Sequence, residues 1–346
     1  MKANMNYEGV RQNYFKILKI ALGTTIAILI ADALGLAYSS SAGIITLLSI
    51  QDTKKDTLKI ALKRLVSFCL AVVTAYVLFG LFGYEVIVFG VFLLIFVSAS
   101  YFFGLMDGVA MNSVLTTHFL ANQVMDQVSI INEVGIFTIG VTVGIVINLF
   151  MLEDTRYIRS NMKRIEEEMK QVFHIMAEML RDPKRTGQGT PNEMEKTRIF
   201  EPVKITIDTA LEQAQRNQKN KLFNDTSYYT VYTLMRKQQV SILKRVYEQI
   251  MRLTEVTEQA ETLAQFFEDL AESFHEYNNS EALLKYLQEM LIQYESEELP
   301  KTRSEFENRA LLYASICDMD LFLRTKREFV LSLTTKEIER FWKQDK

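Results

Sequence analysis

The feature that most constrains this sequence is the stretch from Leu65 to Thr155, which contains no lysine and no arginine. A soluble domain of that length needs basic side chains on its solvent-exposed surface, because charged residues make up about a quarter of an ordinary globular chain. Residues 1–152 contain 9 Lys and Arg and 8 Asp and Glu, whereas residues 153–346 contain 30 and 34. The sequence therefore predicts two unlike domains, 1–152 and 153–346, and excludes a one-piece soluble enzyme.

Long apolar runs in the first domain match the thickness of a lipid bilayer, whose ~30 Å hydrocarbon core takes about 20 residues of α-helix. We expect six membrane-spanning helices, over residues 17–36, 37–50, 65–82, 86–103, 105–124 and 134–152. The second is short for a span, and the fifth is unusually polar. Because unpaired backbone groups are costly in lipid, the expected fold of this domain is a transmembrane bundle of six helices.

Three clusters of basic residues set the expected topology. They lie at Lys2–Lys19, Lys54–Arg64 and Arg156–Arg164. The positive-inside rule places all three in the cytoplasm, and this requires residues 37–50 to cross as well. We therefore expect a multi-pass membrane protein with both termini in the cytoplasm.

The second domain is expected to be a cytosolic bundle of helices, and the whole chain to be all-α. Apolar residues from Ile158 to Met179 repeat four and three apart, which predicts the core of a bundle, or an adaptable groove because several of them are methionines. The basic residues of the helix around Arg236 are expected on a solvated face. Thr302 with Glu305, and likewise Thr334 three residues before a glutamate, has capping-box spacing.

The sequence lacks the common motifs of catalysis. It contains no Walker A loop, no HExxH, no GxSxG and no EF-hand, and its three histidines have no metal-ligand spacing. Net charge is −3 at neutral pH, without the basic excess of a nucleic-acid-binding protein. We expect no enzymatic activity, no cofactor, no metal and no nucleic-acid partner.

Two segments carry a resemblance to a known family. They are Leu48–Thr53, at the end of the second expected span, and Leu58–Arg64, which leads into the third. With the six spans and the helical tail, the layout resembles the aromatic acid exporter family of Gram-positive bacteria. That family lies within the wider fusaric-acid-resistance group, to which the plant aluminium-activated malate transporters are also similar. In the wider group a Gln or a polar turn closes the second span and an Arg precedes a Gly-Thr-x-x-Gly segment. Gln51 and Arg64 match that pattern, whereas Ser67, Phe68 and Ala71 stand where its small residues would be.

The resemblance implies export or channelling of small organic anions across the plasma membrane without ATP, by a homodimer. Lys55, Lys59 and Lys63 recur at i, i+4 and i+8, so they share a helix face on which they would attract a carboxylate. Arg64, beside them, has a planar guanidinium that binds a carboxylate bidentately. The alternative is that this cluster only orients the helices and contacts anionic lipid.

Three ionisable residues inside the expected spans are further candidates for the anion path. Asp32 lies near the outer end of the first span, where it either lines a cavity or reaches the interface. Asp107 and His118 are eleven residues apart on one expected helix, so they would share a face about 16 Å apart. Histidine titrates near neutral pH, which suits proton coupling. The alternatives are that Asp107 caps a helix and that His118 hydrogen-bonds a carbonyl.

Taken together, the sequence favours an exporter of a small organic anion, plausibly an aromatic carboxylate, driven by an ion gradient. Two alternatives stay open. One is a passive organic-anion channel gated by the cytosolic domain, and the other is a membrane-anchored helical scaffold that binds a cytosolic partner.

Overall fold

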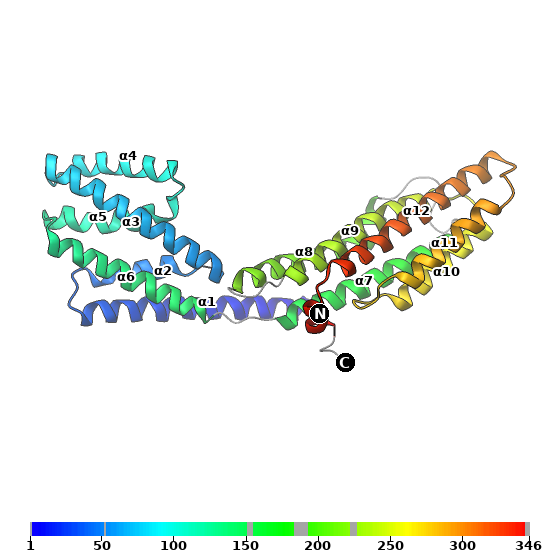
Figure 1. The fold of residues 1–346 in the computed structure, drawn as a ribbon, viewed down its shortest axis with the longest axis horizontal. Helices are drawn as coiled ribbons and strands as arrows, with labels where there is room; N and C mark the ends of the chain where they lie inside the picture. The colour runs from blue at the N-terminus through cyan, green and yellow to red at the C-terminus, as the bar shows by residue number, and fades with distance from the viewer. Residues whose placement is uncertain (1, 52, 151–154, 183–192, 222–226, 343–346) are drawn as a thin grey trace. The chain divides into compact units, whose positions relative to one another are not determined.

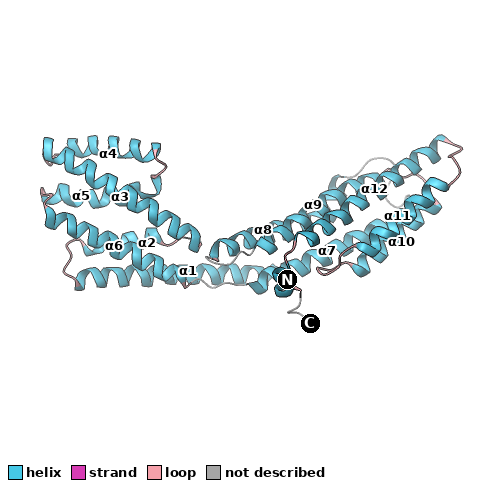
Figure 2. Cartoon of the chain, viewed as in Figure 1, coloured by secondary structure: helices cyan, strands magenta, loops and turns pink. Residues whose placement is uncertain are grey.

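The computed structural model consists of helices joined by turns (Figures 1 and 2). It describes residues 2–51, 53–150, 155–182, 193–221 and 227–342, with side chains from Tyr14 onward, and no strand occurs among these residues. The predicted all-α class is therefore confirmed. The chain divides into two compact units, unit 1 (1–153 with 219–224) and unit 2 (154–218 with 225–346).

Unit 1 contains the apolar helices and one 3₁₀ turn. In chain order they are α1 (Lys2–Ala33), α2 (Ser39–Ser49), α3 (Lys54–Phe82), α4 (Val86–Phe102), the turn η1 (Met106–Gly108), α5 (Val109–Asn122) and α6 (Gln127–Leu149). Among the described residues, three segments are long and apolar enough to cross a membrane, namely Tyr14–Ala33, α3 and α6, while α2 and α4 are apolar but shorter. The helix lengths thus support a membrane-embedded unit, and the count of six crossings stays a prediction.

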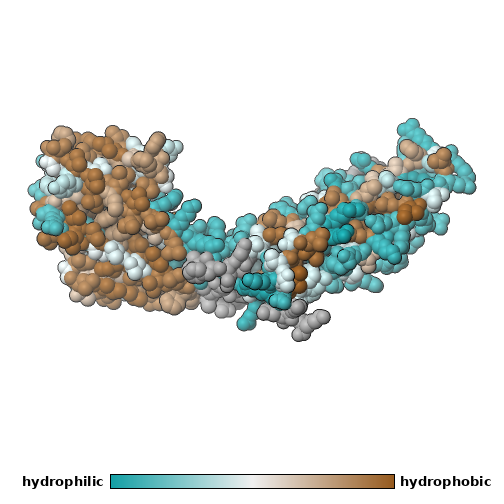
Figure 3. All heavy atoms as spheres, viewed as in Figure 1, coloured by the Kyte–Doolittle hydropathy of each residue, from teal (hydrophilic) through white to brown (hydrophobic). Residues whose placement is uncertain are grey.

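The outside of unit 1 is as apolar as its interior. Ile87 and Phe102 are each 82% exposed, and many other large apolar side chains share this position. Figure 3 shows the visible face of unit 1 almost entirely in the colour of hydrophobic residues. Such a surface is unfavourable in water and suits contact with lipid chains.

The expected span 65–82 is part of a longer helix, α3, which begins at Lys54 and includes the expected helical face of Lys55, Lys59 and Lys63. Thr53 caps this helix, because its Oγ1 accepts a hydrogen bond from the Asp56 backbone N–H at 3.2 Å. The expected helix 105–124 is wrong at its start. Gly104 has a φ of +66°, residues 106–108 form the 3₁₀ turn, and α5 begins only at Val109. Asp107 therefore does not lie on the same helix face as His118.

Glycines bring α2 against α6. A Cβ at Gly140 would lie 2.5 Å from Cγ2 of Ile45, and one at Gly144 would lie 2.6 Å from Cβ of Ser49. The Thr46 hydroxyl donates to the Gly140 carbonyl at 3.0 Å. The small residues of α6 thus serve a helix contact within the chain, as ordinary packing predicts.

Contacts at the two ends of unit 1 show that its helices alternate in direction. At one end, the Asn148 side chain of α6 donates to the Thr53 carbonyl before α3 and to the Thr57 hydroxyl. At the other end, the Asn132 amide of α6 donates to the Ala37 carbonyl before α2 at 3.1 Å. Figure 1 shows the antiparallel helices side by side. Helix α5 runs from the first end to the second, between η1 and the region of Ala37.

Unit 2 is a helical bundle. Its helices are α7 (Thr155–Arg181), α8 (Glu193–Asn220), α9 (Ser227–Ile250), α10 (Glu258–Ser273), α11 (Glu281–Ser296), α12 (Arg303–Ser332) and α13 (Thr335–Phe341). The apolar repeat from Ile158 to Met179 on α7 is buried, so its methionines fill the core, and Val172 and Met179 also line a pocket of about 450 Å³ between α7 and α8. Thr334 forms the complete capping box with Glu337, whereas Thr302 accepts from the Glu305 N–H.

Candidate functional site

Two clusters of polar side chains in unit 1 are centred on buried ionisable residues. The Arg64 cluster comprises the buried Arg64, Ser49, Ser67 and Asn112 with the exposed Asp107, and the His118 cluster comprises the buried His118, Glu133 and Ser41 with the half-buried Asn132 and the exposed Tyr38. They lie toward opposite ends of α5. Polar groups in an apolar unit are costly to bury, so such clusters mark functional positions by default.

The Arg64 cluster is built where α2 ends and where η1 meets α3. Arg64 is only 6% exposed. Its Nε donates to the Asp107 backbone carbonyl at 3.0 Å, and its Nη1 donates to the Ser49 hydroxyl at 3.1 Å. Within the described part of the chain, no carboxylate contacts this guanidinium, and its Nη2 makes no hydrogen bond. A buried cation without an anionic partner is ready to receive one.

The Asp107 carboxylate is directed elsewhere. Its Oδ2 accepts from Nζ of Lys63 at 3.2 Å, and the two side chains are 40% and 38% exposed. An ion pair at this exposure contributes about 0–1 kcal/mol. Asp107 therefore positions Arg64 through its backbone and leaves the guanidinium's charge largely uncompensated.

Two polar atoms beside Arg64 have no hydrogen-bond partner. The Ser67 hydroxyl and the Asn112 Oδ1 are buried and unsatisfied, although the Asn112 Nδ2 donates to the Arg64 carbonyl at 3.4 Å. A Cβ at Gly108 would lie 2.6 Å from Cβ of Ser67, so the backbone approaches closely here. Buried groups left unpaired cost about 1–3 kcal/mol each, unless a ligand or water satisfies them.

The His118 cluster joins the start of α2, the last turn of α5 and the second turn of α6. His118 Nδ1 lies 2.8 Å from Oε2 of Glu133, and its Nε2 lies 3.1 Å from the Ser41 hydroxyl. The Tyr38 ring stacks on the imidazole with centroids 4.1 Å apart. Asn132 Nδ2 donates to Glu133 Oε1 at 3.1 Å. Both partners of the His–Glu pair are buried.

The structure brings together only some of the residues that the sequence singled out. Arg64, Lys63 and Asp107 meet in one place, and His118 lies in the second cluster. Lys55, Lys59 and Asp32 are exposed on the surface of unit 1. The Gln51 side chain donates to the Leu48 carbonyl at 2.9 Å, so it closes the end of α2.

Sequence reasoning missed the partners of these residues, Glu133 above all. Glu133 was expected in an outward loop, but α6 starts six residues earlier, at Gln127. The signal for this start is Asp126, whose carboxylate accepts from the Ser129 N–H at 2.8 Å. The spacing of Asp126 and Ser129 is readable in the sequence. No spacing rule points to Ser49, Ser67 or Asn112.

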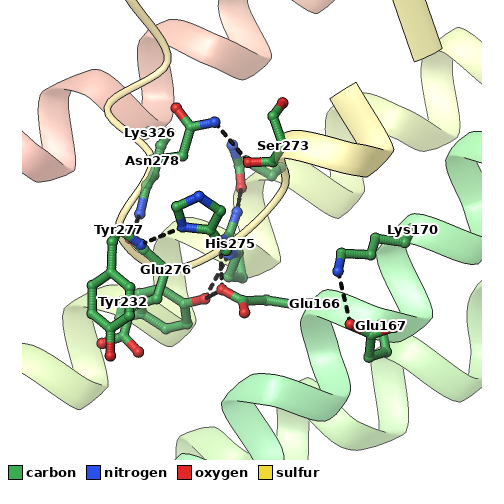
Figure 4. A network of polar contacts seen from close by, with 12 residues as sticks. Glu166, Glu167, Lys170, Tyr232, Ser273, His275, Glu276, Tyr277, Asn278 and Lys326 are labelled. Atoms are coloured by element: carbon green, nitrogen blue, oxygen red, sulfur yellow. Dashed lines mark hydrogen bonds and ion pairs between the residues drawn. The ribbon is translucent and has the colours of Figure 1, made fainter. Parts of the chain in front are cut away.

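Unit 2 holds a third buried polar network, between α7, α9 and α12 (Figure 4). Arg236, expected on a solvated face, is only 1% exposed, and its Nη2 lies 3.0 Å from Oε1 of Glu166. Its Nε donates to the Tyr232 hydroxyl at 2.9 Å. Burial, aided by the nearby Arg236 charge, holds the pKa of Lys326 well below its ordinary value, and burial raises the pKa of Glu276.

No group of His, Cys, Asp and Glu among the described residues has the geometry to hold a metal ion. The arrangement of the Arg64 cluster fits anion binding, and that of the His118 cluster fits the handling of a proton.

Comparison with known proteins covers nearly the whole chain. Residues 12–151 match the family described as "Aromatic acid exporter family member 1", and residues 155–327 match the "Putative aromatic acid exporter C-terminal domain". The chain is similar to "Uncharacterized protein YqjA" of Bacillus subtilis (strain 168), with 31% identity over 315 residues, or 91% of this chain and 95% of that protein.

A solved structure described as a "putative membrane protein from Clostridium difficile 630" is 25% identical, covering 51% of this chain and 99% of that one with a TM-score of 0.44. The two family matches confirm the resemblance to the aromatic acid exporter family. The chain belongs to the aromatic acid exporter family.

Proposed function

We propose that this protein is a membrane transporter that exports small organic anions, specifically aromatic carboxylates, across the plasma membrane and draws on an ion gradient. The observation that carries the proposal is the buried Arg64, whose guanidinium, among the residues that the structure describes, donates only to a hydroxyl and a carbonyl. Membership of an exporter family supports transport and speaks against an enzyme.

Arg64 has the chemistry that a carboxylate requires. A guanidinium presents parallel N–H donors that match the two carboxylate oxygens, and such pairs strengthen when water is excluded. Its Nη2 is unused, and the unpaired Ser67 hydroxyl lies one helical turn further along α3. An arriving carboxylate would satisfy both donors at once.

The apolar surroundings of Arg64 suit an aromatic ring. Phe68, one turn after Arg64 on α3, stacks on Phe137 of α6 with ring centroids 4.7 Å apart. Both rings are buried in the same apolar cluster as Met111. A substrate with a carboxylate and a benzene ring would meet a cation and an aromatic surface about one helical turn apart.

The topology proposed with this function has six crossings and both termini in the cytoplasm. The alternating directions of the helices support it, because they place Lys54–Arg64 and the end of α6 on the same side of unit 1. Helix α2 has 11 residues and α5 has 14, so they extend about 17 and 21 Å of the ~30 Å core. Short helices of this kind often end at binding sites inside transporters.

On the cytosolic side, the exposed Lys55, Lys59 and Lys63 would raise the local concentration of anions near Arg64. A homodimer is part of the proposal, as the family resemblance implies. The cytosolic unit would then regulate the path or join the two subunits.

The decisive experiment measures anion efflux from proteoliposomes loaded with a panel of aromatic and aliphatic acids. Arg64→Ala should abolish efflux of the transported acids, and Arg64→Lys should restore part of it because the charge remains. Cys69→Ala, at an exposed position of the same helix with no role in the proposed anion path, is the control and should retain the efflux. Undiminished efflux by folded Arg64→Ala protein would remove Arg64 from the mechanism.

A further inference from the structure

The His118–Glu133 pair is an acid and a base held together inside an apolar unit. Nδ1 of His118 and Oε2 of Glu133 are 2.8 Å apart, and their side chains are 9% and 3% exposed. The other polar atom of each side chain also has a partner. Nε2 of His118 contacts the Ser41 hydroxyl, and Oε1 of Glu133 accepts from the Asn132 amide. The geometry is that of an acid and a base joined directly by one hydrogen bond, along which a proton can pass.

Charge balance makes that proton necessary. Without it the pair carries one buried negative charge, which is costly in an apolar medium unless a cation compensates it. No lysine or arginine occurs between Leu65 and Thr155, and none occurs in α2. The basic residues of α3 lie at the η1 end of α5, eleven residues and about 16 Å of helix before His118.

The neighbouring helices offer no cation either. The titratable side chains that they bring toward this end of unit 1 are Tyr38 before α2, Asp32 near the end of α1, Glu85 before α4 and Asp126 before α6. On α3, Cys69 and Tyr76 are exposed on the apolar surface. All of these are neutral or acidic. Only the proton of the pair itself can neutralise Glu133.

We propose that the His118–Glu133 pair is a proton-binding site, and that the proton it exchanges is the one coupled to anion export. The coupling part rests on the proposed function, whereas proton binding stands on the geometry alone. The pair switches between a net charge of −1 and zero at one end of α5, while the anion binds at the other end. Helix α5 therefore links the two sites, through Asn112 at the carbonyl of Arg64 and His118 in its last turn.

The site is covered and yet near the surface. The Tyr38 ring lies flat on the imidazole, and its hydroxyl donates to Oδ1 of Asn122 at 2.6 Å. Tyr38 has a φ of 59°, an uncommon conformation for a residue with a side chain, and it is partly exposed. Proton entry thus requires only local movement at the start of α2.

Proton binding is tested without any transport assay. The full chain, with ¹⁵N-labelled imidazoles, is studied in lipid vesicles by solid-state NMR; it has three histidines, and His118→Asn identifies the signal of His118. The His118 signals are followed from about pH 5 to 8, the range in which histidine protonation is commonly studied, and they should change with pH. Glu133→Gln should change that titration, and Asp126→Asn, on the same helix, should leave it intact. A His118 signal that is constant over this range, or identical in Glu133→Gln, would overturn the proposal.

Coupling is tested in proteoliposomes with two assays on the same variants. Glu133→Gln should lose transport driven by a pH gradient but keep anion-for-anion exchange at equal pH, which needs no net proton movement. Transport by Glu133→Gln that still follows the pH gradient, or loss of both activities in folded protein, would refute the coupling role. If the unaltered protein moves no organic acid in either assay, the proposed function fails, and the NMR titration still decides the proton site.

Discussion

Arg64 contacts the backbone carbonyl of Asp107 and not its carboxylate, so the two residues form a hydrogen bond without forming an ion pair. Nε of Arg64 donates to the backbone carbonyl of Asp107 at 3.0 Å, while the Asp107 carboxylate pairs with Lys63 on the surface. The chain thus holds its buried guanidinium in place without neutralising it.

The first prediction follows from this contact. Asp107→Asn keeps the backbone carbonyl that holds Arg64 and removes only an exposed ion pair worth about 0–1 kcal/mol. Efflux should therefore stay close to that of the unaltered protein, in contrast to Arg64→Ala. Efflux rates of both variants in the same proteoliposome preparation check this. A loss as deep as that of Arg64→Ala would show that the carboxylate itself has a role.

A second prediction concerns substrate choice. Phe68→Leu keeps an apolar side chain of similar size, so stability should change by less than about 1.5 kcal/mol. It removes the ring that stacks on Phe137, so export of aromatic acids should fall relative to aliphatic acids. The ratio of the two efflux rates is the measurement. Phe96→Leu, in the separate apolar cluster between α3 and α4, is the control and should leave the ratio unchanged.

The contact between α2 and α6 gives a third prediction. In Gly140→Ala the new Cβ would lie 2.8 Å from the Ala42 backbone carbonyl, which cannot move aside without shifting α2. Overpacking of this kind costs about 1–3 kcal/mol. The melting temperature in detergent should fall, whereas Gly80→Ala should not lower it, because nothing lies within 4 Å of a Cβ there. Equal melting temperatures for the two variants would contradict the packing described.

The buried network of unit 2 predicts an unusual pH dependence. Burial raises the pKa of Glu276 in the folded state above its ordinary value of 4.5. At pH values between 4.5 and this raised pKa, the folded state binds more protons than the unfolded state. The free energy of unfolding should therefore fall as pH rises through that window, the reverse of a salt-bridged glutamate.

In Glu276→Gln the new amide can still accept a hydrogen bond from the Tyr228 hydroxyl. The free energy of unfolding of this variant should vary less with pH in the same window. The chain's one tryptophan, Trp342, donates to the Tyr228 hydroxyl at 3.0 Å, so its fluorescence reports on the network during unfolding. Glu272→Gln, an exposed carboxylate on α10, is the control. Parallel pH profiles for the protein and Glu276→Gln would show that Glu276 is not the group responsible.

A fifth prediction tests the topology with single cysteines introduced by Glu85→Cys, Asp126→Cys and Lys59→Cys in a chain whose two native cysteines are replaced. Six crossings place positions 85 and 126 outside and position 59 inside. A membrane-impermeant thiol reagent added to intact cells should label the first two and not the third. Labelling of position 59 from outside would rule out this topology.

How far the sequence predicts this protein depends on the kind of residue. The apolar unit follows from the missing lysines and arginines, and the burial of Arg64 follows from its place directly before that stretch. Asp107 and His118 were expected on one face because a continuous helix was assumed across Gly104, whose φ of +66° ends it. Glu133 was missed because the helix was expected to begin together with the apolar run at residue 134, whereas α6 begins at Gln127.

Arg236 shows a different limit. Its helix, α9, has an apolar stripe that predicts one buried face, but α7 and α12 both pack on it and enclose the basic residue as well. The number of neighbours around a helix is a property of tertiary packing. No periodicity in one segment reveals it.

The shortness of α2 has a consequence for the way its ends are satisfied. A helix of 11 residues extends about 17 Å, well short of the ~30 Å hydrocarbon core of a bilayer. Polar side chains of the neighbouring helices meet both of its ends: Ser41 near the start contacts the His118 ring, and Ser49 at the end accepts from Arg64. Lengthening α2 by a turn at either end would therefore displace one of these two contacts.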